Sequence, residues 1–232
     1  MNKSYGLIFD VDGVIADSEK VNANASIKVF SDLFGIHDVQ RKDFEAGLGR
    51  GAEEYIKAAA LIHNLKLTHQ QIAAACIARQ NNFLEILKDG PLPPFPGVLE
   101  LMNAALTRDD FCVAIATSGA REKSEAVLKS AQVPYKQVVY ITGDDAKRKK
   151  PNPDLFLIAA RGINVPPKNC VVIEDAPNGI QAAHAAGCKC IAVTNSTSAE
   201  KLLQADLIVS DMTQVSLDNI IAILHEGCDS RE

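Results

Sequence analysis

The sequence predicts an α/β protein in which a parallel sheet carries an inserted all-helical domain, and two observations indicate this class. Apolar segments bounded by turn residues recur along the chain, and most are continuously hydrophobic, as strands buried on both faces are. Segments with helical periodicity alternate with them, which is typical of a parallel sheet covered by helices on both sides. The core is therefore expected to be a Rossmann-like parallel sheet.

The elements of this core follow one another in a regular order. The expected strands lie within residues 5–13, 111–119, 137–145, 169–177, 188–196 and 205–211. Helices are expected over residues 120–132, 152–162 and 178–187. We expect Gly162 and Gly187 to close the last two helices, because glycine readily adopts the left-handed conformation that ends many helices.

The region from about Lys20 to Asp89 breaks this alternation. It has apolar positions at helical spacing and no comparable strand. The segment "DGPLPPFPGV" follows this region, and its four prolines predict a stiff linker that connects the helical region to the α/β part. The sequence thus predicts a core domain of residues 1–16 and 92–232 and a helical cap domain of residues 17–91.

Composition excludes several classes of function. A net charge of -5 and a single short basic run, Lys147–Lys150, make nucleic acid a poor partner. No segment approaches the ~18 apolar residues of a membrane span, and the N-terminus lacks a signal-peptide pattern. The six cysteines are scattered, mostly in apolar runs, so they are expected to be reduced. We expect a cytoplasmic protein that functions as a monomer, without nucleic-acid or membrane partners.

The first strand ends in clustered negative charge, at Asp10 and Asp12. Carboxylates are rarely held beside a core unless a cation lies between them. Alternation along an extended segment places both side chains on the same side, so they can serve one reacting centre. The first strand therefore predicts a cation site and a use for an ionised carboxylate.

Other strands deliver polar groups to the same edge of the sheet, where ligands of open parallel sheets bind. These groups are Thr117-Ser118-Gly119, Gly143-Asp144-Asp145 with Lys150 beyond, and Glu174-Asp175. An all-oxygen ligand set of Asp10, a backbone carbonyl and the acids of the fourth strand suits Mg²⁺, which commonly bridges to phosphate oxygens.

This arrangement predicts phosphoryl chemistry on a small phosphorylated metabolite. Ser118 and the backbone up to Gly119 can donate to phosphate oxygens where the chain turns into a helix, and Lys150 supplies positive charge. Asp10 can attack phosphorus and form an aspartyl phosphate. Asp12 can protonate the leaving oxygen and later accept a proton from water.

These motifs resemble those of the haloacid dehalogenase-like superfamily, in the branch of β-phosphoglucomutases, CbbY-like proteins and small-molecule phosphatases with a helical cap. The similarity lies in "FDVDGVIADSE", "ATSG", "KPNPDLF" and "VIEDAPNGIQAA", in the family's order, and it covers nearly the whole chain. It implies the following roles: Asp10 as nucleophile, Asp12 as acid and base, Ser118 and Lys150 as phosphate binders, and Asp10, the Asp12 carbonyl and Asp175 as Mg²⁺ ligands, with Glu174 bound directly or through water.

Further candidates carry weaker signals. The resemblance implies that Arg50, in "GLGRG", contacts substrate from the cap, and the alternative is a solvent-exposed loop arginine. Asp144 and Asp145 either orient Lys150 or only form a turn with Gly143.

The leading functional hypothesis is a Mg²⁺-dependent phosphatase for a sugar phosphate. The first alternative is a β-phosphoglucomutase, which returns the phosphoryl group to sugar. Such mutases usually carry a histidine twelve positions after the nucleophile, where this chain has Asn22, so hydrolysis is favoured. The second is a phosphoacceptor or binding protein without catalysis, as in response-regulator receivers, which lack the helical insertion and the second aspartate.

Overall fold

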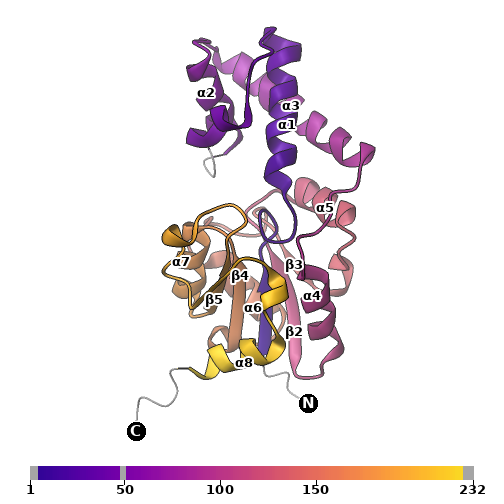
Figure 1. Ribbon diagram of the computed structural model, residues 1–232, viewed down its shortest axis with the longest axis vertical. Helices are drawn as coiled ribbons and strands as arrows, with labels where there is room; N and C mark the ends of the chain where they lie inside the picture. The colour runs from indigo at the N-terminus through magenta and orange to yellow at the C-terminus, as the bar shows by residue number, and fades with distance from the viewer. Residues whose placement is uncertain (1–4, 48–50, 227–232) are drawn as a thin grey trace. The chain divides into compact units, whose positions relative to one another are not determined.

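The computed structural model describes residues 5–47 and 51–226 and divides the chain into two compact units (Figure 1). The core unit comprises residues 1–17 and 92–232, and the helical unit comprises residues 18–91.

The core unit is built on one parallel six-stranded sheet, as the sequence predicts. The strands are β1 Tyr5–Phe9, β2 Phe111–Ala116, β3 Val139–Ile141, β4 Cys170–Glu174, β5 Lys189–Val193 and β6 Leu207–Val209. Their order across the sheet is β3-β2-β1-β4-β5-β6. The strand order thus changes direction at β1 and β4, and in open parallel sheets such a switch point is where ligands bind.

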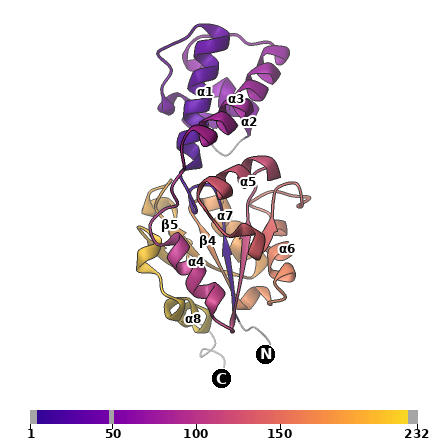
Figure 2. The same ribbon diagram turned by 90° about the vertical axis from the view of Figure 1, so that its right-hand side faces the viewer.

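Helices cover both faces of this sheet. They are α4 Val98–Thr107, α5 Arg121–Ser130, α6 Asp154–Gly162, α7 Pro177–Ala186 and α8 Leu217–His225. α6 packs on β2, β3 and α7, whereas α4 packs on β2 and α8. Figures 1 and 2 show α4 and α8 on one side of the strands and α6 on the other.

The central strands are hydrophobic on both faces because both faces are covered. Leu7 and Ile8 are consecutive in β1, so they point to opposite faces, and both have no exposed surface. Ile8 belongs to a core cluster that contains Val172 of β4, Phe156 of α6 and Ile180 of α7. The uninterrupted apolar runs in the sequence are therefore the signature of a doubly covered sheet.

The two glycines expected to close helices behave differently. Gly187 follows α7 with φ +83°, the left-handed conformation that was predicted. Gly162 is the last residue of α6, so the helix ends where it was expected to, but the left-handed residue is Asn164, at φ +56°. Glycine is needed at position 162 for space, because a Cβ there would lie 2.7 Å from a methyl carbon of Val139.

In its described residues the helical unit contains helices and no strand. Its elements are α1 Ser18–Phe34, the short 3-10 helix η1 Arg41–Gly47, α2 Ala52–Ile62 and α3 His69–Asp89. Phe44 and Tyr55 stack with ring centroids 4.6 Å apart, and Phe30 packs edge-on against Phe44. This aromatic cluster gives the unit a hydrophobic core of its own.

None of the helices among the described residues combines the length and the apolar character that crossing a membrane requires.

Candidate active site

Three carboxylates meet at the carboxyl edge of the sheet. Asp10 directly follows β1, Glu174 ends the neighbouring strand β4, and Asp175 comes next. All three are buried, and one oxygen from each can be chosen so that the three lie within 4.8 Å of one another. The backbone N–H of Asp10 donates to Ile173 O at 3.1 Å, which extends the pairing of the two strands to the site.

A buried ammonium group joins two of these carboxylates. Lys150 Nζ donates to Asp10 Oδ1 at 2.5 Å and also to Glu174 Oε1. The ammonium lies 5.0 Å from the ring centroid of Phe156, so the packed start of α6 also holds the lysine. Because charge-assisted hydrogen bonds in a buried site are strong, Lys150 fixes the relative positions of Asp10 and Glu174.

Burial and like charge perturb the titration of the cluster. Burial raises the pKa of Asp10 well above its usual value, and the lowering effect of Lys150 does not compensate because Glu174, Asp175 and Asp12 add like charge. Burial beside Glu174 raises the pKa of Asp175 to about 7. Although burial opposes it, the two carboxylate partners raise the pKa of Lys150, which therefore stays charged.

Two glycines make room for the acidic side chains. A Cβ at Gly13 would lie 1.8 Å from Asp175 Oδ2, so there is no space for a side chain. Gly13 also has φ +78°, a left-handed backbone conformation that favours glycine. A Cβ at Gly179 in α7 would lie within 2.2 Å of three carboxyl atoms of Glu174. Gly179 thus allows α7 to approach Glu174 closely, and Gly13 allows the turn after β1 to approach Asp175.

Asp12 lies at the more open side of the site, with 38% of its side chain exposed. Its Oδ2 would be 3.6 Å from a Cβ placed on Gly119, so the carboxylate faces the turn that follows β2. Its Oδ1 lies 3.9 Å from Lys123 Nζ of α5. The sequence reasoning missed Lys123, although its position four residues after Gly119 places it one helical turn beyond that glycine.

Ser118 provides a hydroxyl group without a partner. Its Oγ is buried and makes no hydrogen bond in the described part of the chain. The N–H of Gly119 donates to Thr117 Oγ1 at 3.0 Å, so this candidate phosphate donor already has an acceptor. A buried polar atom without a partner is costly, and a bound anion is one way to satisfy it.

Two residues after β5 also support the site and were not predicted. Asn195 Nδ2 donates to the Gly13 carbonyl oxygen at 2.9 Å. The Ser196 side chain hydrogen-bonds to Asp175 and lowers its pKa against the effect of burial. The sequence could have indicated both residues, because they follow the fifth strand, and ligands of open parallel sheets bind at the carboxyl ends of the strands.

The remaining candidates lie elsewhere. Arg50 falls outside the described residues. Asp144 and Asp145 hydrogen-bond to Arg121, and Asp145 also to Thr142, rather than to Lys150.

The charges of the site are unbalanced. When the carboxyl groups of Asp10, Asp12, Glu174 and Asp175 are all ionised, they exceed the ammonium groups of Lys150 and Lys123 by two charges. The oxygens of Asp10, Glu174 and Asp175 could hold a metal ion. An all-carboxylate set of this kind suits a hard divalent cation.

The sheet, the acidic edge and the paired lysine define a class of hydrolases. A family model described as haloacid dehalogenase-like hydrolase matches residues 6–187, and the chain belongs to this family. The expected family is therefore confirmed.

Three known proteins illustrate the similarity. Validoxylamine A 7'-phosphate phosphatase from Streptomyces hygroscopicus subsp. limoneus is 31% identical over 92% of this chain and 96% of its own length. The Arabidopsis thaliana protein SUPPRESSOR OF QUENCHING 1, chloroplastic, is 34% identical over 94% of this chain, but the chain spans only 21% of that relative's length. The crystal structure of CbbY from Rhodobacter sphaeroides in complex with phosphate has a TM-score of 0.79 at 29% identity, covering 94% of this chain and 99% of that one.

Proposed function

We propose that this protein is a Mg²⁺-dependent phosphatase that hydrolyses a small phosphorylated metabolite of the sugar-phosphate class. The observation that carries the proposal is the buried set of Asp10, Glu174 and Asp175 around Lys150 at the carboxyl edge of the sheet. The named phosphatase and the phosphate-bound CbbY among the similar proteins support the reaction class. The helical unit, residues 18–91, serves as the cap domain that determines which substrate is accepted.

Each residue has a distinct task in the proposed reaction. Asp10, Asp175, the Asp12 carbonyl and, directly or through water, Glu174 would hold Mg²⁺, which would supply positive charge beside the substrate phosphate. Ser118 and Lys150 bind the phosphoryl oxygens, and the Gly119 amide joins them by exchanging its hydrogen bond to Thr117 Oγ1 for one to phosphate. Asp10 attacks phosphorus as the bond to the leaving oxygen breaks, and Asp12 donates a proton to that oxygen. Asp12 then takes a proton from the water that releases phosphate from Asp10.

The function is tested by inorganic phosphate release from sugar phosphates, polyol phosphates and nucleotides, with and without Mg²⁺. We expect Mg²⁺-dependent release from a small group of the sugar and polyol phosphates. β-Glucose 1-phosphate with a bisphosphate primer is assayed in parallel. Negligible phosphate release together with formation of glucose 6-phosphate would contradict the phosphatase proposal and indicate a mutase.

The environment of Asn22 favours hydrolysis over the mutase. Asn22 is buried on α1, and its Oδ1 accepts a hydrogen bond from Arg79 Nη2 at 2.7 Å. An amide held in this way cannot take a proton from a sugar hydroxyl, as a histidine at this position could.

Asp12→Ala should lower kcat about 10²- to 10⁴-fold for a sugar phosphate but much less for an aryl phosphate. The alkoxide leaving group of a sugar needs the proton that Asp12 donates, whereas a nitrophenolate needs little protonation. The measurement is kcat for both substrates in the wild type and the variant. Equal losses for the two substrates would contradict the role of the Asp12 carboxyl group as the proton donor to the leaving oxygen.

Without Mg²⁺, the free energy of unfolding should fall as the pH rises from about 4 to about 7. The pKa of Asp175 is about 7 in the folded protein against 3.8 as the ordinary value, so the folded state binds the extra proton in this range. Above pH 7 this contribution no longer changes. Mg²⁺ should therefore raise the melting temperature more at pH 8 than at pH 5, because at pH 5 it competes with protons. An equal shift at both pH values, or none, would contradict metal binding at this cluster.

A further inference from the structure

We propose that Asp144 and Asp145 are positioning residues for the phosphate-binding turn. The turn is defined as residues 117–121, after β2, and the residues that hold it form the support loop, residues 141–145, at the end of β3. The inference rests on the proposed function, because it concerns the placement of Ser118 and Gly119.

Backbone contacts join the two segments at alternate residues of the turn. The N–H of Thr117 donates to Ile141 O at 3.0 Å, and the N–H of Gly143 donates to Gly119 O at 2.9 Å. The approach is close enough to require glycine, since a Cβ on Gly143 would lie 2.3 Å from Ser118 O. The support loop thus lies directly against the backbone of the turn.

Asp144 supplies the cap that α5 lacks in its own sequence. The residue before α5 is Ala120, whose side chain cannot accept a hydrogen bond. Instead, Asp144 Oδ2 accepts from the N–H of Arg121 at 2.9 Å. A carboxylate at the first turn of a helix satisfies a free N–H and interacts favourably with the helix dipole. The start of α5, and with it the end of the turn, is therefore fixed by a distant segment.

Asp145 fixes the same residue through its side chain. Its Oδ2 accepts from Arg121 Nη2 at 2.8 Å and from the backbone and hydroxyl of Thr142 at 2.8 and 2.7 Å. The Arg121 guanidinium also lies 5.0 Å from the ring centroid of Tyr140 in β3. Arg121 is thus held by both carboxylates and by an aromatic ring, all from the neighbouring strand and its loop.

The pattern of contacts explains how the Ser118 hydroxyl group stays available for a ligand. Residues 117, 119 and 121 bind the support loop through their backbones, whereas Ser118 Oγ is buried without a partner in the described structure. A hydroxyl placed in this way needs a rigid backbone to remain directed at a ligand. Losing the support should misplace the donors of the turn, and small misplacements of binding groups have large effects on reactions they assist.

The test measures inhibition by orthophosphate as a competitive probe, together with kcat and KM, in Asp144→Ala and Asp145→Ala. We expect the inhibition constant and KM to rise about tenfold in each variant, with a smaller change in kcat. Asp144→Asn should recover most of the affinity, because its amide oxygen can accept the same hydrogen bond from Arg121.

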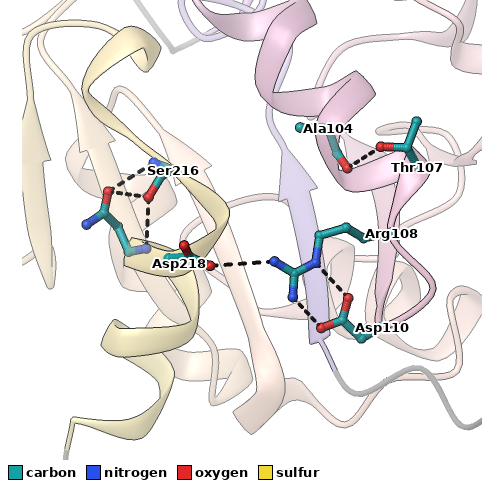
Figure 3. A network of polar contacts seen from close by, with 7 residues as sticks. Ala104, Thr107, Arg108, Asp110, Ser216 and Asp218 are labelled. Atoms are coloured by element: carbon teal, nitrogen blue, oxygen red, sulfur yellow. Dashed lines mark hydrogen bonds and ion pairs between the residues drawn. The ribbon is translucent and has the colours of Figure 1, made fainter.

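Asp110→Ala is the matched control. Asp110 precedes β2 at the opposite edge of the sheet and accepts two hydrogen bonds from Arg108, at 2.9 and 2.6 Å (Figure 3). Its side chain is 37% exposed and that of Asp145 is 36% exposed, so the two aspartates match in exposure and in having an arginine partner. The control should leave the inhibition constant within twofold of the wild type.

The outcomes separate this inference from the proposed function. Unchanged inhibition constants in both the Asp144 and Asp145 alanine variants, with weakened inhibition in Ser118→Ala, would overturn the positioning role alone. Unchanged inhibition in Ser118→Ala as well would overturn both the phosphate role of the turn and the support inferred for it. Equal losses in Asp144→Asn and Asp144→Ala, or a loss in the Asp110→Ala control, would also contradict positioning by these two carboxylates.

Discussion

Asp10→Asn should abolish phosphate release, with kcat reduced about 10⁴-fold or more, while the fold remains intact. An amide cannot attack phosphorus, so no aspartyl phosphate forms. The fold should tolerate the change because the substitution removes one charge from a cluster in which burial raises the pKa of Asp10. Asn also keeps an oxygen that can accept the hydrogen bond from Lys150.

The measurement is single-turnover phosphate release in the wild type and the variant, with urea unfolding of both in parallel. We expect the variant to be at least as stable as the wild type without Mg²⁺. Asp110→Asn serves as the control, since that residue lies at the opposite edge of the sheet and pairs with Arg108. Turnover within tenfold of the wild type would show that Asp10 is not the nucleophile.

Lys150→Met should lower both activity and stability. The methionine can keep the contact with Phe156 but leaves Asp10 and Glu174 buried without their ammonium partner. Breaking a buried ion pair in this way costs about 3–5 kcal/mol of unfolding free energy. We expect kcat to fall about 10²- to 10³-fold, because the substrate phosphate also loses a positive partner.

The loss of stability should depend on pH in a defined direction. Asp10 and Asp175 already have raised pKa values, and removing Lys150 raises them further, so protonation at pH 5 relieves the repulsion. Urea unfolding in EDTA should therefore show a larger destabilisation at pH 8 than at pH 5. Lys189→Met is the control: Lys189 forms a partly exposed pair with Asp206 and should contribute at most about 1 kcal/mol. Equal destabilisation by the two lysine variants would contradict the role given to Lys150.

Much of the fold could be predicted because the relevant signals are local. A strand covered on both faces, such as β1, must be apolar at consecutive positions, and an amphipathic helix must repeat its apolar residues about every 3.6 positions. These requirements distinguish the sheet-forming segments from the helical region of residues 20–89 without knowledge of the partners of any element. The rule that ligands bind at the carboxyl ends of parallel strands then selected Asp10, Ser118, Lys150 and Glu174 as candidates.

Local signals could not reveal which groups touch. Lys150 and Asp10 are 140 residues apart in the chain, and Lys150 follows β3, which β2 separates from β1 in the sheet. The same limit applies to Gly162: the sequence indicated that α6 ends there, but not that Val139 approaches too closely for a side chain at this position. Lys123, Ser196 and the support from Asp144 and Asp145 likewise depend on contacts between elements.

The sequence by itself therefore determined the class of fold, the expected family and the set of chemically capable residues at one edge of the sheet. Only the tertiary structure decided that Asp10, Glu174 and Asp175 share one buried space with Lys150, and that Ser118 Oγ has no hydrogen-bond partner among residues 5–47 and 51–226. The physical reason is the distance along the chain over which each kind of interaction acts. Propensity and periodicity act over a few residues, whereas burial, charge pairing and hydrogen bonding at the site join segments that meet only when the sheet is complete.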